Sequence, residues 1–267
     1  MPYNVIIADK ITKKYGNRTI LDSLDLSVAE GEHIALVGPS GCGKSTLLSI
    51  ISGLNDQSEG NIKVFGESEK QQRLSYCAWM PQKDLLFPWM TVAENTALSL
   101  TNQHLSKRKA LKKAIPYLER FGLGEYSNKP PYAMSGGMRQ RASFVRTILT
   151  GKDILLFDEP FGALDSITRM DLQNWLKDTL SSMNKTSVLV THDVEEALVL
   201  SDRVVVMSRN PGRIIHEIPG FFSNEMDRSH LAAEEDFVHA REQIISYLRD
   251  AQNQHPASEH SETVKEG

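Results

Sequence analysis

Residues 38–45 read Gly-Pro-Ser-Gly-Cys-Gly-Lys-Ser, which matches the pattern G-x-x-x-x-G-K-[ST] of loops that bind phosphate groups. Glycines let successive backbone N–H groups curl around phosphate oxygens. Lys44 is placed to reach the β- and γ-phosphates of a nucleotide, and the Ser45 hydroxyl is placed to ligate Mg2+. A chance match in a chain of this length has a probability on the order of 1 in 100. The loop therefore predicts nucleotide binding rather than an empty turn.

Cys42 lies inside this loop, where a thiol could be a catalytic nucleophile. We do not favour that interpretation, because the pattern leaves this position variable and no His or Asp is implied beside it. Oxidation or alkylation there could still block nucleotide binding. Cys77 has no metal-ligand spacing, so we expect both cysteines to be reduced, buried thiols.

A second candidate site follows residues 154–157, which are four consecutive apolar residues ending in Asp158 and Glu159. This pattern places both carboxylates at the carboxyl end of a buried parallel strand, where ligands of α/β sheets gather. Asp158 could hold Mg2+, and Glu159 could orient and polarise an attacking water. An isolated Asp-Glu pair would usually be a surface turn. Beside a phosphate-binding loop, we favour metal and water handling.

The elements that must position these residues can be read from the apolar pattern. Alternation around the turn at residues 15–17 predicts an antiparallel sheet at the amino end. A buried strand at 34–37 and a helix that ends at Gly53 flank the phosphate-binding loop. Strands and helices alternate again from 153 to 218, which predicts a parallel sheet. The other expected elements are strands at 62–65 and 74–80, helices at 91–100, 106–121 and 136–149, and a final helix at 231–251.

Further motifs lie between and after these sites, namely Ser135-Gly136-Gly137-Met138-Arg139-Gln140-Arg141, Ala163-Leu164-Asp165 and Thr191-His192-Asp193. Together with the phosphate-binding loop and the acidic pair, in this order, they resemble the nucleotide-binding subunit of an ATP-binding-cassette (ABC) transporter over residues 3–220. The resemblance implies an α/β P-loop NTPase fold, with an ABC-type ATPase core, an antiparallel β subdomain and an inserted α-helical subdomain. We therefore expect an ATPase domain at 1–220 with its helical subdomain at about 91–150, a helical extension at 221–251 and a disordered tail at 252–267.

The resemblance also implies a role for each matching residue. Glu159 and His192 are the catalytic residues, and His192 is the switch histidine that hydrogen-bonds the γ-phosphate. Tyr15 falls where the family places an aromatic ring that stacks on adenine, although by itself it would more often be a packed residue at a strand end. The implied ATP contacts are Tyr15, Gly38, Pro39, Ser40, Gly41, Cys42, Gly43, Lys44, Ser45, Thr46 and Gln82, and the implied magnesium ligands are Ser45, Gln82 and Asp158.

The Ser135-Gly136-Gly137 segment resembles the family signature, which faces the γ-phosphate of ATP held by a second subunit. Asp165 resembles the aspartate that organises the partner's site. Two positions depart from the family consensus: Met134 replaces Leu, and Met138 replaces Gln. We interpret these as subfamily variation, because the backbone donors of the signature remain. Two subunits, either a homodimer or a pair of ABC subunits, are expected to enclose two ATP molecules head to tail.

Charge and hydropathy narrow the class of protein and the kinds of partner. The net charge is -4, and most of the excess acid lies in residues 221–267, so the remainder is near neutral and no nucleic-acid partner is expected. The basic run from Lys107 to Lys113 is expected to be a solvated helix face rather than an anion-binding patch. No apolar stretch approaches the roughly 20 residues of a membrane span, and no secretory signal is visible. We expect a peripheral protein at the cytoplasmic face of the membrane, paired with transmembrane permease subunits and, through them, with a solute-binding protein.

The detailed motifs are most similar to the bacterial nitrate, sulfonate and taurine importer group, which also contains importers of thiamine-pyrimidine precursors. The apolar segment 85–90 could pack internally, but we favour its lining a groove for a permease helix. The alternative class is a mechanical ATPase acting on chromosomes or ribosomes. Chromosome-type members insert long coiled coils before the signature, ribosome-associated members usually fuse two cassettes, and neither feature occurs here. A P-loop kinase would have no use for the signature or for His192.

Overall fold

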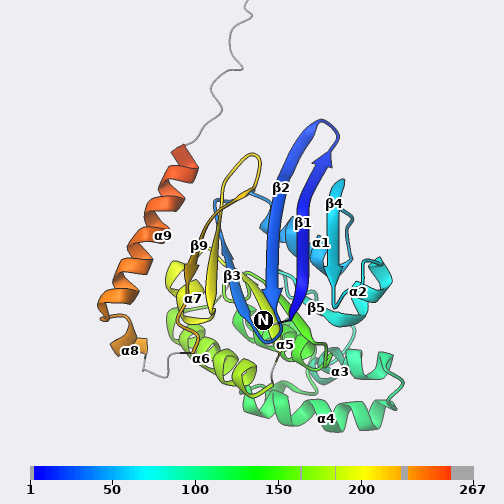
Figure 1. The fold of residues 1–267 in the computed structure, drawn as a ribbon. Coiled ribbons are helices and arrows are strands. Elements are labelled where there is room, and N and C mark those ends of the chain that lie inside the picture. The colour runs from blue at the N-terminus through cyan, green and yellow to red at the C-terminus, as the bar shows by residue number, and fades with distance from the viewer. Residues whose placement is uncertain (1–2, 163, 184, 224–227, 254–267) are drawn as a thin grey trace, which may run out of the picture.

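The computed structural model describes residues 3–162, 164–183, 185–223 and 228–253 (Figure 1). Its centre is a six-stranded sheet with the order β5-β6-β7-β3-β8-β9. The strands β5 to β8 in this order are mutually parallel, whereas β9 runs antiparallel to β8. The predicted parallel sheet is therefore confirmed, with an antiparallel edge strand. The strands are β3 (His33–Val37), β5 (Cys77–Met80), β6 (Ile154–Asp158), β7 (Thr186–Val190), β8 (Arg203–Met207) and β9 (Ile214–Pro219).

The amino-terminal part forms the predicted antiparallel sheet, which consists of β1 (Asn4–Tyr15), β2 (Arg18–Ala29) and β4 (Glu59–Val64) in the order β2-β1-β4. The helix α1 (Lys44–Ser52) packs between this sheet and one face of the parallel sheet, and its apolar side chains share a single buried cluster with both. Gly53 ends α1 with a φ of 83°, as predicted. A side chain there would strain the backbone and would place its Cβ 2.5 Å from the Lys70 carbonyl oxygen. Apolar contacts with a sheet on each side thus fix the position of α1, the helix that follows β3.

The opposite face of the parallel sheet packs against the inserted helices. Alternate residues of β3 point to opposite faces, so Ala35 joins this second core while Ile34 joins the first. Phe144 stacks on Phe157 with ring centroids 5.1 Å apart, which ties the insertion to β6. The inserted helices are α3 (Val92–Asn102), α4 (Lys107–Arg120) and α5 (Gly136–Ile148), with 3-10 turns at Gly124–Tyr126 and Pro131–Ala133.

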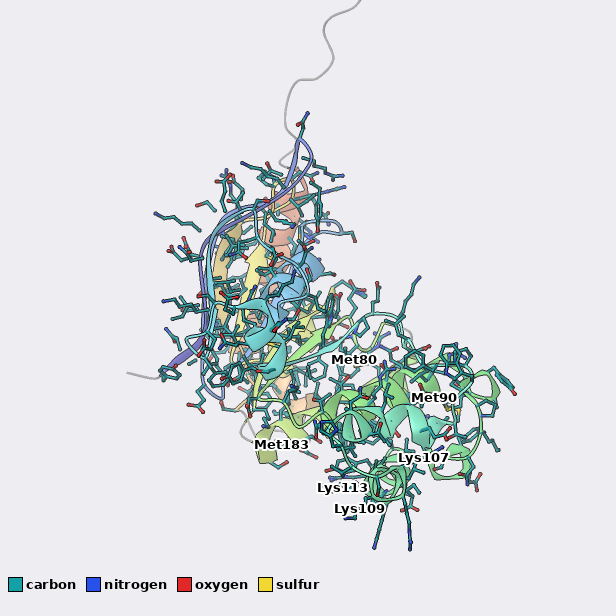
Figure 2. All side chains as sticks on the ribbon, turned by 90° about the vertical axis from the view of Figure 1, so that its right-hand side faces the viewer. Met80, Met90, Lys107, Lys109, Lys113 and Met183 are labelled. Carbon is teal, nitrogen blue, oxygen red and sulfur yellow. The ribbon has the colours of Figure 1, made fainter. Side chains whose placement is uncertain are left out.

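The basic run lies on α4. Figure 2 shows Lys107, Lys109 and Lys113 on the side of the inserted helices that faces away from the parallel sheet. Their side chains are exposed, whereas Ala110, Ala114 and Leu118 bury the opposite face of the helix. This arrangement agrees with the expected solvated helix face.

The remaining helices are α6 (Ser166–Met183), α7 (Val194–Val199), α8 (Arg228–Leu231) and α9 (Glu235–Asn253). The predicted final helix at 231–251 is displaced, because Leu231 belongs to the separate helix α8. The predicted tail at 252–267 is also wrong at its start: residues 252 and 253 continue α9, while residues 254–267 lie outside the described part of the chain. The Arg241 guanidinium donates to Glu195 at 3.0 Å, and Tyr247 stacks on His216, so α9 packs on α7 and β9.

The predicted strand at 74–80 is wrong over its first half. Residues Lys70–Tyr76 form a helix, α2, and only Cys77–Met80 pair with β6. The segment before Tyr76 is rich in Gln, Lys, Arg and Leu, which favour helices. Arg73 is buried at 2% exposure and its guanidinium donates to the Ile50 carbonyl, an interaction between α2 and α1 that the apolar pattern of the sequence does not reveal.

We predict that Gly212→Ala destabilises the protein by about 1–3 kcal/mol, the usual cost of overpacking. Gly212 joins the turn before β9 to β2 by donating to the Ile20 carbonyl at 2.8 Å, and an added Cβ would lie 2.0 Å from the Cys42 carbonyl oxygen. Gly151→Ala is the control: its φ is 68°, but no atom lies within 4 Å of the added Cβ, so only backbone strain is expected. Equal losses of unfolding free energy in urea for the two variants would contradict this prediction.

Candidate functional site

The parallel register brings four loops to one edge of the sheet. Leu36 of β3 pairs with Val190 of β7, and Val190 pairs with Asp158 of β6. Phe157 of β6 pairs in turn with Met80 of β5. All these strands run in the same direction, so the phosphate-binding loop, Glu159, His192 and Gln82 leave the sheet on the same side. The topology thus assembles residues that are far apart in the sequence.

The phosphate-binding loop curls through left-handed glycines, with φ of 79° at Gly41 and 99° at Gly43. Lys44 is the first residue of α1, and its ammonium donates to the Gly38 carbonyl at 2.7 Å and to the Pro39 carbonyl at 3.2 Å. The side chain is therefore held inside the curl of the loop, at the positive end of a helix. This combination favours an anion. Of the other loop residues, Ser40, Gly41 and Ser45 are exposed, whereas Pro39 and Cys42 are buried and Thr46 is half-buried.

Cys42 supports the loop from inside. The thiol is fully buried and its sulfur lies 3.7 Å from the Lys44 ammonium nitrogen. Burial raises the pKa of the Cys42 thiol, although the nearby lysine opposes this shift. A Cβ on Gly38 would lie 2.9 Å from the same sulfur. Cys42 therefore packs as a protonated side chain beneath the loop, in agreement with the rejection of a catalytic thiol.

The acidic pair occupies the end of β6. The Ser45 hydroxyl donates to Asp158 Oδ1 at 3.0 Å, which joins the first turn of α1 to β6. Burial raises the pKa of the Asp158 carboxyl, the Ser45 hydrogen bond opposes the shift, and the negative charge of Glu159 adds to it. The oxygens of Ser45 and Asp158 are hard donors of the kind that Mg2+ prefers.

Glu159 has a left-handed backbone with φ of 47°, which is unusual for a residue with a side chain. This conformation turns the chain sharply after Asp158. The Gln82 amide donates to Glu159 Oε2 at 2.8 Å, and His192 Nδ1 lies 3.7 Å from the same oxygen. Backbone strain of this kind is often found at functional sites. Gln82 and His192 thus meet at the carboxylate of Glu159, and all three residues were singled out from the sequence.

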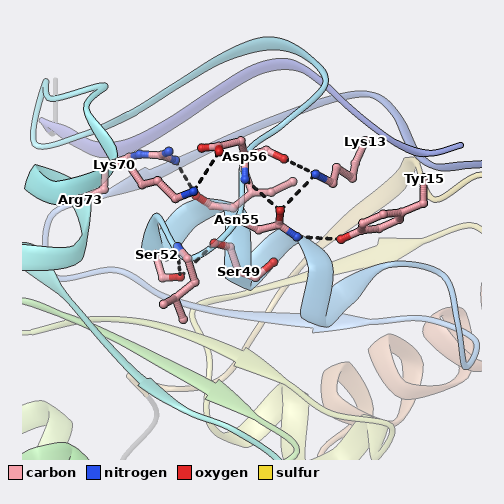
Figure 3. Close-up of polar contacts among 10 residues, drawn as sticks. Lys13, Tyr15, Ser49, Ser52, Asn55, Asp56, Lys70 and Arg73 are labelled. Carbon is pink, nitrogen blue, oxygen red and sulfur yellow. Dashed lines mark hydrogen bonds and ion pairs between the residues drawn. The ribbon is translucent and has the colours of Figure 1, made fainter.

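Tyr15 lies at the end of β1 and is half exposed. Its hydroxyl accepts from the Asn55 amide at 2.7 Å, and the Lys13 ammonium lies 4.9 Å from the ring centroid (Figure 3). Lys13 also donates to Asn55 Oδ1 at 3.1 Å, so Asn55, just beyond α1, holds both side chains. Among the described residues, Tyr15 has no hydrogen bond to the phosphate-binding loop, and its ring is held by the segment that follows α1.

The signature segment lies on the inserted helices, apart from the phosphate-binding loop. Ser135 caps α5 and accepts from the Met138 backbone N–H at 3.3 Å. A Cβ on Gly136 would contact the Arg139 guanidinium at 3.9 Å, whereas a Cβ on Gly137 would lie 3.0 Å from Leu164, so the signature adjoins the segment that carries Asp165. Hydrogen bonds from Thr168 lower the pKa of the Asp165 carboxyl. Ala163 lies outside the described residues. Within the described part of the chain, no hydrogen bond or ion pair joins the signature to Lys44 or Glu159.

The match to known proteins agrees with this geometry. Residues 21–162, more than half of the chain, match the ABC transporter family. The chain belongs to the ABC transporter family. An aliphatic sulfonates import ATP-binding protein of Pseudomonas syringae pathovar tomato is 42% identical over 217 residues, which cover 81% of this chain and 88% of that protein. A formylaminopyrimidine import ATP-binding protein of Halalkalibacterium halodurans is 41% identical over 192 residues, which cover 72% and 74%.

A solved structure shares the fold of this ABC transporter subunit. It is a dimeric ATP-binding cassette in a post-hydrolysis state, bound to ADP and Pi, with 30% sequence identity and a TM-score of 0.73. The match covers 80% of the present chain and 98% of that cassette. The family resemblance and the predicted fold class are therefore confirmed, and the chain is the ATP-binding subunit of an ABC transporter.

A buried carboxyl that the sequence pattern does not single out lies behind the site of this ABC subunit. Glu196 is only 3% exposed and accepts from the Gln173 amide at 2.9 Å. Burial raises the pKa of Glu196 to about 7. The spacing Asp193-x-x-Glu196 could have drawn attention to the residue as a capping box, but only Asp193 plays its part, by accepting from the Glu196 backbone N–H at 3.0 Å. Glu196 lines a small pocket with Glu159, Phe161, Gly162, Arg169, Thr191, His192 and Asp193.

We predict that Glu196→Gln stabilises the ABC subunit increasingly as the pH rises from 5 to 7. The folded state disfavours the ionised carboxyl, so wild type loses stability between the ordinary value of 4.5 and the raised pKa of about 7. Glutamine mimics the protonated form and escapes this loss, which amounts to about 3 kcal/mol at most. Urea unfolding measures the difference between the variant and wild type, which should become constant about one pH unit above the raised pKa.

Glu195→Gln is the matched control, because it removes a negative charge from the same helix at the contact with Arg241. The same pH trend in both variants would show that loss of charge in general, rather than burial of Glu196, causes the effect.

Proposed function

We propose that this ABC transporter subunit hydrolyses ATP as one half of a pair of cassettes, and that closure and opening of the pair drive an importer. The observation that carries the proposal is the convergence of Ser45, Asp158, Gln82 and His192 around Glu159 and the phosphate-binding loop. Ser45 contacts Asp158 at 3.0 Å, and Gln82 contacts Glu159 at 2.8 Å. This arrangement supplies phosphate binding, metal binding and activation of water at one sheet edge.

The proposed magnesium site fits the donor set. Among the described residues, no group of three or more His, Cys, Asp and Glu side chains could hold a metal by itself. This agrees with Mg2+, which is usually held by one or two protein oxygens together with nucleotide phosphates and waters. Ser45 and Asp158 would provide the protein oxygens, with Gln82 close by. When bound, the metal would neutralise charge on the phosphates of ATP.

Each remaining residue has a defined task in the proposed hydrolysis. Lys44 and the backbone N–H groups of the loop bind and orient the phosphates, and the exposed ring of Tyr15 offers a surface for adenine. Glu159 accepts a hydrogen bond from the attacking water and polarises it, while the Gln82 amide fixes the position of Glu159 Oε2. His192 lies beside the same carboxylate and hydrogen-bonds the γ-phosphate. The side chain of His192 is 68% exposed, so it can reach a ligand outside the chain's own surface.

The position of the signature supports pairing of two cassettes. Ser135 caps the helix α5, and Gly136 and Gly137 begin it, so the signature lies at the positive end of a helix. Because no described contact joins the signature to the phosphate-binding loop within one chain, a second copy, or a paired ABC subunit, is needed to bring a signature to each bound ATP. The dimeric state of the related cassette is consistent with this arrangement. Hydrolysis removes the γ-phosphate that joins both chains, so the pair can open.

A permease would dock on the segment after Gln82. Trp89 is 77% exposed, and Leu85 and Phe87 are also exposed, whereas Leu86 is buried. Internal packing therefore accounts for Leu86 and in part for Met90, which is half-buried. The buried Asn95 amide donates to the carbonyls of Phe87, Met90 and Thr91, and accepts from the Phe87 N–H at 2.7 Å. The Arg146 guanidinium binds the Asp84 and Leu85 carbonyls, so the apolar surface is held in a fixed shape. Such a preformed apolar surface suits a short partner helix.

None of the described helices is both long and apolar enough to cross a membrane. We therefore assign the channel to transmembrane permease subunits and place this subunit at the cytoplasmic face of the membrane. The named relatives import aliphatic sulfonates and formylaminopyrimidine. These names support import of a small anionic solute of the nitrate, sulfonate or taurine type, or of a thiamine-pyrimidine precursor, delivered by a solute-binding protein. They also favour transport over a mechanical ATPase.

Glu159→Gln should retain ATP binding while stalling hydrolysis, because the amide keeps the shape of the carboxylate but cannot polarise water. We expect a stable nucleotide-bound dimer in size-exclusion chromatography with MgATP, and at least a 100-fold loss of phosphate release, within the usual range for a general base. Lys44→Ala is the control: it should bind no ATP in calorimetry and stay monomeric. Phosphate release by Glu159→Gln at the wild-type rate would remove Glu159 from its proposed role.

Replacing both Phe87 and Trp89 with Ser should abolish co-purification with a multi-span permease while leaving ATP binding intact. The two rings lie 5.1 Å apart and both are exposed, so the double variant removes both exposed aromatic rings of the segment. Tyr3→Ser provides the control, since Tyr3 is also an exposed aromatic but belongs to the antiparallel sheet region. Undiminished capture of the permease by the double variant would refute docking at this surface.

A further inference from the structure

Two polar contacts join α6 to the first turn of α7. The Gln173 amide donates to Glu196 Oε2 at 2.9 Å, and the Arg169 guanidinium lies 3.8 Å from Asp193 Oδ2. Arg169 and Gln173 are one turn apart on α6, while Asp193 is the N-cap of α7 and Glu196 lies in its first turn. The two helices are thus connected at two successive turns of α6.

Each of these two helices is preceded by a residue with a proposed role in the site. Asp165 precedes α6 and accepts from the Thr168 N–H at 3.0 Å, and Arg169 also donates to the Leu164 carbonyl at 3.1 Å. His192 precedes the Asp193 cap of α7. The contacts between the helices therefore connect the segment that carries Asp165 with the segment that carries His192, inside one chain.

The Gln173–Glu196 contact is the better protected of the two. Gln173 is 1% exposed and Glu196 is 3% exposed, so water cannot readily replace either partner. Thr191, the residue before His192, lines the same small pocket as Glu196, so the carboxyl lies next to the segment that carries His192. Separating the pair would break a buried hydrogen bond, and this cost favours a single relative position of α6 and α7.

We propose that Gln173 and Glu196 are positioning residues that hold His192 against Glu159 and connect it mechanically to the segment carrying Asp165. This inference rests on the proposed function, in which Asp165 faces a paired cassette. A displacement of Asp165 on pairing is then transmitted through α6 and Glu196 to His192. Through this connection, pairing with a second cassette is required to place His192 of the same chain correctly for hydrolysis.

The geometry explains why His192 needs such support. α7 has only six residues, too few to be stable as an isolated helix, so its position depends on the contacts it makes. His192 itself is exposed, and its ring lies 3.7 Å from Glu159 Oε2, close to hydrogen-bonding range but beyond it. A small shift of α7 would move the ring relative to Glu159 without altering the phosphate-binding loop. Loss of the contact should therefore affect turnover rather than ATP binding.

The test is the steady-state ATPase activity of the full chain carrying Gln173→Ala, with the neighbouring exposed residue in Asn174→Ala as the matched control. We expect Gln173→Ala to lower kcat about 10-fold with KM for ATP changed less than about 2-fold, a size typical of coupling through positioning residues. Asn174→Ala should match wild type. Glu196→Gln should retain most of the activity, because its amide oxygen still accepts from Gln173, whereas Glu196→Ala should resemble Gln173→Ala.

A double variant separates positioning of His192 from a general structural role. In the His192→Ala background, Gln173→Ala should cause no further loss of kcat, because the residue that it positions is absent. Multiplicative losses, or equal activities of Gln173→Ala and Asn174→Ala, would overturn the proposal. If Gln173→Ala does not fold by circular dichroism, Arg169→Met at the partly exposed contact tests the same connection with the same expected result. Absence of hydrolysis in wild type would overturn the proposed function and this inference together, whereas an active wild type with unaffected variants overturns this inference alone.

Discussion

The parallel hydrogen bonding of β5, β6, β7 and β3 is the constraint on which the site depends. It fixes the register so that Met80, Asp158, Val190 and Val37 all end their strands at one edge. Each strand is covered on both faces, by α1 and the antiparallel sheet on one side and by the inserted helices on the other. A shift of one residue in any strand would turn its side chains to the wrong core, so packing enforces the position of the loops that carry the candidate site.

Burial of carboxyl groups at this edge costs folding free energy, and packing of the surrounding core compensates for that cost. Burial raises the pKa of both Asp158 and Glu196, and Glu159 lies between them with a left-handed backbone. Carboxylates in such surroundings disfavour the charged state until a cation or donor compensates. Ser45 and Gln82 provide part of that compensation at Asp158 and Glu159, and a metal ion with phosphates would complete it. Backbone strain at Glu159 and perturbed ionisation at Asp158 and Glu196 thus occur together in the region where phosphate chemistry is proposed.

The sequence predicts correctly those parts of the molecule that depend on residue types close together along the chain. The phosphate-binding loop, the strand before Asp158 and the helix end at Gly53 each depend on neighbouring residue types, and each is found where expected. The segment before Cys77 was mispredicted as strand because the contact of Arg73 with Ile50 is tertiary. Glu196 was missed for the same reason: its burial and its partner Gln173 come from packing of α7 on α6, which no spacing along the chain reveals. The roles of Tyr15, Asp165 and the signature depend on ligands and on a second chain, so they remain predictions.

The position of the signature relative to the phosphate-binding loop has a consequence for how the subunit could be controlled. Gly137 adjoins Leu164, and the Gln140 amide donates to the Pro160 carbonyl at 3.0 Å, so α5 is attached to the segment between Glu159 and Asp165. Asp84, two residues beyond Gln82, binds the Arg139 guanidinium of the same helix at 3.0 Å. The helix that would face a partner's ATP is therefore connected to Pro160, which directly follows this chain's own Glu159, and to the segment after Gln82, whose amide contacts Glu159. A permease acting on the apolar segment beside Asp84, and a partner acting on the signature, would move the same helix, which explains how transport and hydrolysis could be coupled without a direct contact between solute and nucleotide.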